Sequence, residues 1–321
     1  MRLGIIGTNF ISDRIAEAAL QVDGLVVSAV YSRRDDTGRA FADRHGIPYV
    51  FTECEKMLTS GCVDAVYIAS PTMCHAEHML LAARHGIPAL CEKMLVALPS
   101  EMEDITRAVS GGAVVVEAMR PAFDRLISTV KERLCDLGAI RRATLEYRQY
   151  SSRYDAFLAG EVKNAFDPRM KNSALADIGI YPLYLAVSLF GEPKDIEAHG
   201  EYLSNGFLAS GDVELIYDSF SVTVLYSKTV EGENVSTIEG ECGKILFDRI
   251  NEPSYVTVAI GGCDTKTLYR RDGESNIKNE LSEFMRIAEG DRKKGEELFA
   301  LSSAVMRTVD RIYSALGISF Q

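Results

Sequence analysis

Glu92 and Lys93 are two charged residues at the end of the apolar segment 88-PALCEK-93, which has the composition of a buried strand. The carboxyl ends of parallel strands form the crevice in which α/β proteins bind ligands, so a lysine at such an end is directed toward the ligand. Its ammonium group can hydrogen-bond a reacting oxygen atom and stabilise the negative charge that develops there. The alternative is a solvent-exposed strand end without a chemical role.

Asp177 and Tyr181 form a second pair that could move a proton. They stand four residues apart in 177-DIGIYPLYL-185, a spacing that places both on one face of a predicted helix start. A nearby ammonium group favours the phenolate form of a tyrosine, so a lysine and a tyrosine together can act as general acid and base. The alternative is a packed tyrosine whose hydroxyl group is capped by Asp177.

The first predicted strand runs into the turn 7-GTNFIS-12 and then into a predicted helix. A dinucleotide-binding turn uses three glycines, for the tight bend, the close approach of the pyrophosphate and the helix packing. Gly7 is present, while Asn9, which tolerates positive φ, and the small Ser12 stand at the other two places. A helix N-terminus after a strand favours an anion site over a ligand-free turn. The predicted contacts are Gly7, Thr8, Asn9, Phe10 and Ile11.

The second predicted strand ends in 31-YSRR-34. An acidic residue at this place would bind the free 2′-hydroxyl of the adenosine ribose. Ser32 and Arg33 instead suit a 2′-phosphate, because a guanidinium group matches phosphate geometry. The sequence therefore predicts NADP(H) as the preferred cofactor, with NAD(H) as the alternative because Asp35 and Asp36 follow immediately. A solvated arginine pair without a ligand is the other interpretation.

The elements that must position these residues alternate between strand and helix up to about residue 120. Most of the predicted strands are continuous apolar runs, which are typical of strands covered on both faces. They are 2-RLGII-6, 25-LVVSAVY-31, 48-PYV-50, 63-VDAVYIA-69, 88-PALCE-92 and 113-AVVVEAM-119. The pattern predicts an α/β fold in which residues 1–120 form an NAD(P)-binding Rossmann domain with a doubly wound parallel sheet.

After about residue 120 the pattern changes to polar–apolar alternation, which is typical of an antiparallel sheet with one wet face. Examples are 140-IRRATLEYRQY-150 and 213-VELIYDSFSVTVLYSK-228. Residues 121–321 are therefore predicted to form a C-terminal α+β domain on a mostly antiparallel open sheet. The aromatic-rich segment 147-YRQYSSRYDAF-157 either packs as a loop or covers the substrate as a lid.

Composition excludes several classes of partner. The 321 residues carry a formal net charge of -11 without a cluster of lysines or arginines, which argues against nucleic acid. No segment approaches the roughly 18 apolar residues of a membrane span, and no signal peptide is recognised at the start. Seven scattered cysteines indicate reduced thiols in a cytoplasmic protein. His75 and His78 lack further ligands nearby, so no metal site is predicted.

The segment 64-DAVYIASPTMCHAEHMLLAARHGIPALCEK-93 resembles the signature of the glucose-fructose oxidoreductase and inositol dehydrogenase family. Members of that family have a Ser/Thr-Pro-x-x-x-His step after the fourth strand and Glu-Lys-Pro at the end of the fifth. The resemblance extends from the Gly7 turn to the C-terminal helix. By position it implies that Ser70, Pro71 and His75 line the cofactor, that Glu92 holds the nicotinamide-side ribose and that Lys93 is the catalytic lysine.

Two departures from this family pattern are informative. Met94 stands where the family usually has proline, which could take the cis form and so bears on the aim of Lys93. Tyr181 replaces the histidine of the family's Asp-x-Gly-x-His step. That tyrosine is shared with the dimeric dihydrodiol dehydrogenases, which 117-EAMRPAF-123 also resembles, and Arg120 in this segment is expected to contact the cofactor.

The resemblance implies an enzyme that transfers hydride between the nicotinamide and a secondary alcohol or carbonyl of a small polyhydroxylated substrate, such as a sugar, an inositol or a dihydrodiol. Lys93 and Tyr181 would carry the proton chemistry, with Asp177 orienting them. Residues 121–321 are expected to bind the substrate and to form the contacts of a homodimer or homotetramer. The alternative is a nicotinamide-nucleotide-binding sensor or regulatory subunit without turnover, because Asn9, Met94 and the segment 171-KNS-173 depart from the family pattern.

Overall fold

The computed structural model describes residues 1–271, 273 and 275–318. By its internal contacts the chain divides into two compact units. Unit 1 comprises Met1–Met119 and Ser275–Ala300, and unit 2 comprises Arg120–Glu274 and Leu301–Gln321. Residues 319–321, which the second predicted domain includes, lie outside the described residues. The assignment of separate binding roles to the residues before and after 120 stays a prediction.

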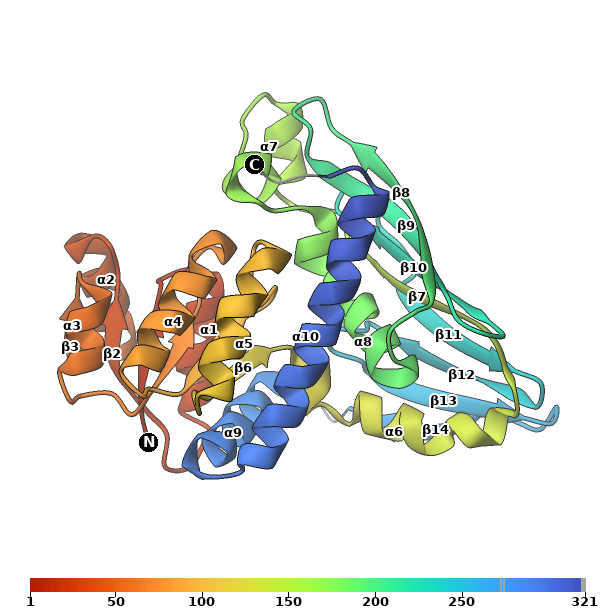
Figure 1. The fold of residues 1–321 in the computed structure, drawn as a ribbon, viewed down its shortest axis with the longest axis horizontal. Coiled ribbons are helices and arrows are strands. Elements are labelled where there is room, and N and C mark those ends of the chain that lie inside the picture. Colours follow the sequence, from red (N-terminus) through yellow and green to blue (C-terminus); the bar gives the residue numbers. More distant parts are fainter. Residues whose placement is uncertain (272, 274, 319–321) are drawn as a thin grey trace. The chain divides into compact units, whose positions relative to one another are not determined.

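Unit 1 is built on a parallel sheet. Its strands are β1 (Arg2–Ile6), β2 (Val26–Tyr31), β3 (Tyr49–Phe51), β4 (Ala65–Ile68), β5 (Ala89–Glu92) and β6 (Val115–Ala118). They form a six-stranded sheet in the order β3-β2-β1-β4-β5-β6 (Figure 1). Every residue of β4 and β6 is buried, as expected for continuous apolar strands covered on both faces. The doubly wound parallel sheet is therefore confirmed, with its switch point between β1 and β4.

The helices of unit 1 alternate with these strands along the chain. They are α1 (Phe10–Ala19), α2 (Asp35–His45), α3 (Cys54–Thr59), α4 (His75–Arg84), α5 (Met102–Ser110), α9 (Asn276–Glu289) and the beginning of α10 (Arg292–Ala315). α1 contacts α2 and α9, whereas α4 contacts α3 and α5. α2 ends where Gly46 adopts the left-handed conformation with φ 67°, which costs little without a Cβ atom.

Unit 2 is built on an open sheet. Its strands are β7 (Ile140–Arg148), β8 (Asp195–Tyr202), β9 (Leu208–Ile216), β10 (Ser221–Ser227), β11 (Val235–Gly240), β12 (Gly243–Asp248), β13 (Tyr255–Ile260) and β14 (Lys266–Arg270). The order is β14-β13-β12-β11-β7-β10-β9-β8, and neighbours are antiparallel except for the parallel pair β7 and β10. The predicted mostly antiparallel open sheet is confirmed.

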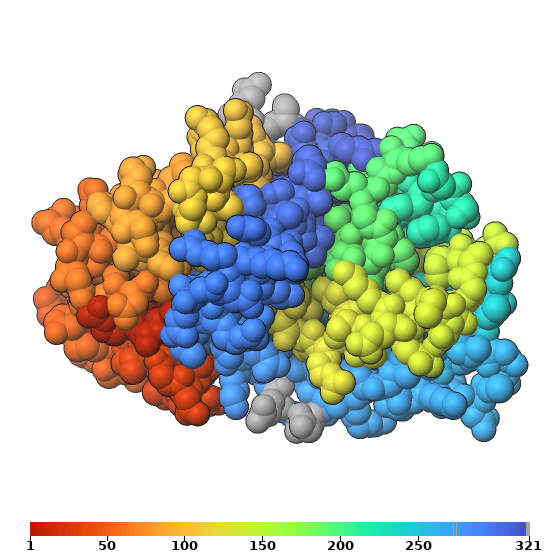
Figure 2. Space-filling model, turned by 60° about the horizontal axis from the view of Figure 1, so that its bottom comes forward, coloured from red at the N-terminus to blue at the C-terminus, as the bar shows by residue number. Residues whose placement is uncertain are grey.

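Helices cover part of this second sheet. The helices of unit 2 are α6 (Arg125–Arg133), α7 (Tyr154–Leu158), α8 (Ile180–Phe190) and the end of α10, and a π-helical turn (Leu175–Gly179) leads into α8. α8 contacts β7 and β10, where Val222 and Val224 of β10 are fully buried. α6 contacts β13 and β14, and its yellow-green atoms border the light-blue atoms of that segment in Figure 2.

Short 3-10 turns connect several of these elements. They are Thr72–Cys74, Pro99–Glu101, Arg120–Phe123, Leu134–Leu137, Asn164–Phe166 and Pro168–Met170. Within the described part of the chain, no helix combines the length and the apolar character that a bilayer crossing requires. The seven cysteines are free thiols.

Candidate active site

The turn after β1 accepts only glycine at its first position. Gly7 has φ 113°, and a Cβ atom added there would lie 2.8 Å from the backbone oxygen of Ala69. Asn9 has φ -90° and acts as the N-cap of α1, because its Oδ1 accepts hydrogen bonds from the backbone N–H groups of Ile11 and Ser12 at 3.1 and 3.2 Å. Its tolerance of positive φ, on which the sequence argument relied, is therefore not used.

This N-cap also joins two strand ends. Asn9 Nδ2 donates to the Ala69 carbonyl at 2.8 Å, so one amide side chain ties the turn after β1 to the end of β4. Ser12 is fully buried, as its predicted packing role requires. Phe10, the first residue of α1, is 71% exposed. The positive end of the α1 dipole lies at this turn, where it favours a bound anion.

The two arginines after β2 differ in their surroundings. Arg34 pairs with Asp36 through a short ion pair, and Asp35 accepts from Arg39 at 2.6 Å. Both acidic residues that could have reversed the cofactor prediction are thus engaged by arginines. Arg33 is exposed and makes no hydrogen bond or ion pair within the described part of the chain.

Ser32 provides a hydroxyl group beside this arginine. It is buried, and its Oγ lies 2.7 Å from Thr37 Oγ1 at the start of α2. Thr37 was not identified from the sequence, although it lies only five residues further along. Two hydroxyl groups at a helix N-terminus next to an unengaged guanidinium group form an arrangement suited to a phosphate.

His75 links the segments that follow β4 and β5. It is 1% exposed, its Nδ1 lies 2.9 Å from the Met94 carbonyl oxygen, and its Nε2 lies 2.9 Å from the Ser70 carbonyl oxygen. Burial lowers the pKa of His75, so the neutral ring, which has one N–H, donates to one of the two carbonyls. Ser70 Oγ in turn bonds His78 Nδ1 at 2.9 Å. Among the described residues, no cluster suited to a metal ion is found.

Lys93 follows β5 in a backbone segment with several anchors. The Lys93 backbone N–H donates to Glu92 Oε2 at 3.3 Å, and the Tyr67 hydroxyl donates to the other oxygen of the same carboxylate in a short hydrogen bond. The peptide bond between Lys93 and Met94 is cis, although Met94 is not proline. Two residues on, the Leu95 N–H donates to the Glu117 carboxylate at 3.0 Å. Together with His75, these bonds fix the backbone at the carboxyl end of β5.

Tyr181 lies in the first turn of α8, and its surroundings in unit 2 are cationic and aromatic. Arg120 Nη2 donates to the Tyr181 hydroxyl at 3.4 Å, and the guanidinium carbon lies 5.9 Å from the ring centre. Arg120 Nη1 also lies 3.7 Å from Glu252 Oε2. The Tyr147 ring packs at a tilt with its centre 5.7 Å from that of Tyr181. Arg120, expected at the cofactor, thus contacts Tyr181.

Asp177 lies in the π-helical turn before α8, so its spacing from Tyr181 is not that of a regular α-helix. Its Oδ2 accepts a hydrogen bond from Lys228 Nζ at 2.6 Å. Its backbone N–H donates to the Ser173 carbonyl at 3.0 Å. Lys228 follows β10, and sequence reasoning did not identify it.

The aromatic residues of α7, which lie within the segment 147–157, pack against one another and against a buried ring of the same unit. The Tyr154 and Phe157 rings stack on each other with centres 6.2 Å apart, and both stack on the buried Phe166. The Tyr150 hydroxyl donates to Asp155 at 2.7 Å. Of the two interpretations left open, these contacts support packing for this part of the segment.

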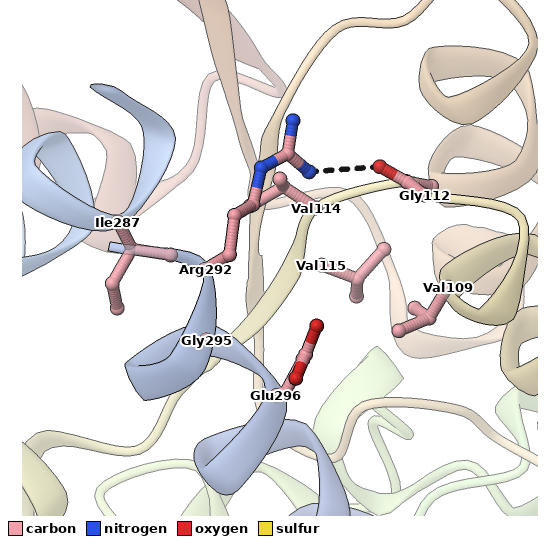
Figure 3. Close-up of a pocket in the computed structure, with 9 residues that line it drawn as sticks. Val109, Gly112, Val114, Val115, Ile287, Arg292, Gly295 and Glu296 are labelled. Atoms are coloured by element: carbon pink, nitrogen blue, oxygen red, sulfur yellow. Dashed lines mark hydrogen bonds between the residues drawn. The ribbon is translucent and has the colours of Figure 1, made fainter. Parts of the chain in front are cut away.

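A small pocket in unit 1 lies away from the predicted site residues (Figure 3). Val114 and Val115 at the amino end of β6 line it, together with Arg292 and Glu296 of α10, and Arg292 donates to the Gly112 carbonyl at 2.8 Å. The predicted site residues of unit 1 instead follow the carboxyl ends of strands. Because ligands of open α/β sheets bind at the carboxyl ends, this pocket is not the candidate site.

Four residues near the site escaped sequence reasoning: Thr37, Tyr67, Glu117 and Lys228. A weak signal existed for two of them, because Tyr67 and Glu117 are polar groups inside apolar strand segments. A buried polar group in such a place normally has a hydrogen-bond partner, so it invites the question of what it holds. No local signal marked Thr37 or Lys228.

Comparison with known proteins gives consistent matches. A family described as "Oxidoreductase family, NAD-binding Rossmann fold" matches residues 1–118, and the "GFO/IDH/MocA C-terminal domain" matches residues 129–245. A scyllo-inositol 2-dehydrogenase (NADP(+)) of Bacillus subtilis is 37% identical over 322 residues, which are 100% of this chain and 98% of the relative.

More distant relatives also cover the full length. A D-xylose 1-dehydrogenase (NADP(+)) of Haloferax volcanii is 26% identical over 98% of this chain and 97% of its own. The crystal structure of a 3-ketoreductase from Actinomadura kijaniata in complex with NADP and TDP-benzene superposes with a TM-score of 0.83, at 21% identity and 98% coverage of both chains. At that identity the likeness shows the fold.

Proposed function

The chain belongs to the GFO/IDH/MocA oxidoreductase family, and from that premise we propose that it is an NADP(H)-dependent dehydrogenase or reductase of small polyhydroxylated substrates. The observation that carries the proposal is the position of Lys93 directly after β5, where its backbone N–H donates to Glu92 and the carbonyl of the next residue, Met94, lies against the His75 ring. A cation in this position can stabilise negative charge on a reacting oxygen atom. The names of the inositol and xylose dehydrogenases support a sugar or inositol as the substrate.

The cofactor-binding residues in the proposal are those of unit 1. The dinucleotide would lie at the turn after β1, whose close approach to the Ala69 backbone leaves room only for glycine at position 7. Arg33, with Ser32 and Thr37 beside it, would hold the 2′-phosphate of NADP(H), and NAD(H) would be a weaker alternative. The other proposed contacts are Thr8, Asn9, Phe10, Ile11, Ser70, Pro71, His75, Glu92, Lys93 and Arg120. His75 would act through the backbone segments of Ser70 and Met94, whose carbonyl oxygens its ring nitrogens contact.

The catalytic residues in the proposal are Lys93, Tyr181 and Asp177. When bound, the nicotinamide accepts or supplies the hydride. Lys93 hydrogen-bonds the oxygen atom of the reacting carbon, and Tyr181 takes the hydroxyl proton in oxidation or returns it in reduction. Arg120 and the Tyr147 ring hold Tyr181 in place, and Asp177 has an orienting role. A sensor without turnover gains no support from the family or its named relatives.

We further propose that residues 1–120 bind the cofactor and that residues 121–321 bind the substrate and form a homodimer or homotetramer in the cytoplasm. The experiment that tests the function is an initial-rate screen of sugars, inositols and dihydrodiols with NADP⁺ and NAD⁺. Turnover of at least one polyol, faster with NADP⁺, is expected. Cofactor binding without turnover of any compound in the three classes would favour the sensor. Light scattering coupled to size exclusion measures the oligomer.

Replacing Arg33 with alanine is expected to weaken NADP(H) far more than NAD(H), because only NADP(H) carries the 2′-phosphate that a guanidinium group binds. The measurement is titration of both cofactors by quenching of the protein's tyrosine fluorescence. Arg34→Ala is the matched control, because the Arg34 side chain is already paired with Asp36. Equal losses for both cofactors in the Arg33 variant would show that Arg33 is structural.

A further inference from the structure

Lys228 is a buried lysine that directly follows β10. Only 3% of its surface is exposed. Its Nζ donates to Asp177 Oδ2 at 2.6 Å and to the Ala165 carbonyl at 3.2 Å. The same atom lies 4.9 Å from the ring centre of Phe166 and 5.7 Å from that of Phe207. All four neighbours attract a positive charge, two through oxygen atoms and two through aromatic faces.

A buried ion pair of this kind is not explained by stability alone. Removing an ammonium group from water costs about as much free energy as the attraction to its partner returns. Well-packed apolar residues in place of such a pair often give a protein that is at least as stable. The pair is also asymmetric, because the Lys228 side chain is 4% exposed and the Asp177 side chain is 33% exposed. The carboxylate therefore reaches an accessible surface, while the ammonium group supports it from the interior.

The position of Asp177 connects this pair to Tyr181. Asp177 lies in the π-helical turn Leu175–Gly179, and Tyr181 lies in the first turn of α8, which follows directly. π-helical turns are rare and often occur at functional sites. Lys228 ties this turn to the end of β10 and, through Ala165, to the 3-10 turn Asn164–Phe166.

We propose that Lys228 is a positioning residue whose ammonium ion holds the Asp177 carboxylate ionised and in one orientation, as a hydrogen-bond acceptor for a hydroxyl group of the substrate. The inference rests on the proposed function, because it assumes a polyhydroxylated substrate at Asp177. It assigns Asp177 the role of an acceptor, not of a proton donor. Lys228 itself acts only through Asp177.

The surroundings of Asp177 make this role visible in a pH profile. The π-helical turn contacts α8, β7, β9 and β10. The titratable and charged groups on these elements are Tyr181 and Tyr184 on α8, Arg141, Arg142, Glu146, Tyr147 and Arg148 on β7, Asp212 and Glu214 on β9, and Tyr226 on β10, with Lys228 after it and Arg120 against Tyr181. Glu146, Asp212 and Glu214 bond Arg148, His199 and Thr223. Burial raises the pKa of Tyr226, which stays neutral in the working range.

The test compares Lys228→Met with wild type in the oxidation of scyllo-inositol by NADP⁺, as kcat/KM against pH. We expect kcat/KM to fall by about 10–100-fold, as for coupled charged groups, mainly through KM. We also expect the acid limb of the profile to move to higher pH, because a carboxylate without its neighbouring cation takes up a proton more readily as the pH falls. Lys228→Arg should restore the acid limb of the wild-type profile. Lys194→Met, at an exposed lysine of the same unit, should leave kcat/KM and its pH profile unchanged.

A uniform loss of kcat/KM with an unmoved acid limb in Lys228→Met would overturn the inference, since a packing role predicts that result. If Lys228→Met does not fold, Asp177→Asn is compared with Asp177→Asn/Lys228→Met, in which no unpaired buried charge is left. The kcat/KM values of these two variants must then agree within about threefold. A further loss of about tenfold in kcat/KM of the double variant would show that Lys228 does not act through Asp177. Wild type without polyol turnover would overturn the proposed function, and this inference with it.

Discussion

Replacing Lys93 with alanine is expected to lower kcat by at least about 100-fold, the typical cost of removing one preorganised group that stabilises developing charge. The loss should be in kcat more than in KM, because the ammonium group acts mainly on charge that forms in the transition state. NADP(H) should still bind, since its other contacts are retained. The measurement is steady-state kinetics with the best substrate of the screen, together with a cofactor titration.

The matched control for this variant is Lys56→Ala. Lys56 belongs to unit 1, is exposed and makes a surface ion pair with Glu53, so its loss should leave kcat unchanged. A Lys93→Ala enzyme with kcat near that of wild type would remove this lysine from the mechanism. Loss of cofactor affinity equal to the loss of activity would instead assign Lys93 to cofactor binding.

Replacing Tyr181 with phenylalanine is expected to lower kcat by roughly 10²–10⁴-fold, the range typical of a general acid or base. The ring keeps its packing against Tyr147, so the melting temperature should change little. Tyr181→His should retain more activity than the phenylalanine variant, because an imidazole can also carry the proton. The measurement is kcat/KM against pH for the three proteins on one substrate.

Tyr202→Phe is the control for the loss of a hydroxyl group. Tyr202 lies in β8 of the same unit and is 47% exposed, so its hydroxyl group should not affect turnover. If the Tyr181→Phe profile coincides with that of wild type, Tyr181 is a packing residue held by Arg120, and the proton is moved by Lys93 or by water.

Much of the fold of unit 1 was predictable, because local sequence patterns indicate its strands and helices. All six parallel strands were predicted, most of them from continuous apolar runs, and β3 was displaced by only one residue, from 48–50 to Tyr49–Phe51. The second sheet was less visible. The alternating segment 213–228 is two strands, β9 and β10, joined by a turn in which the Tyr217 N–H donates to the Phe220 carbonyl. Alternation continues through that turn, and the parallel pairing of β7 with β10 has no local signature.

Among the site residues, too, those with a local sequence signal were identified, and those brought together only by the fold were not. Gly7 was identifiable because a tight turn after a strand needs its conformation, and Lys93 because a charge at a strand end is conspicuous. The predicted role of Asn9 as a residue with positive φ was wrong. An asparagine can either adopt positive φ or cap a helix, and only the folded turn shows that Asn9 caps α1. The Lys228–Asp177 pair spans 51 residues, so only the fold brings its members together.

The central claim is that this protein transfers hydride between NADP(H) and a secondary alcohol carbon. It is tested most directly with scyllo-inositol, or the best polyol of the screen, carrying deuterium on its ring carbons and incubated with NADP⁺ and the wild-type enzyme. Mass spectrometry of the product cofactor should show one deuterium in each reduced NADP molecule, because the hydride moves directly from carbon to the nicotinamide. Reduced NADP without deuterium, or no reduction with any polyol while NADP⁺ binds, would contradict the claim.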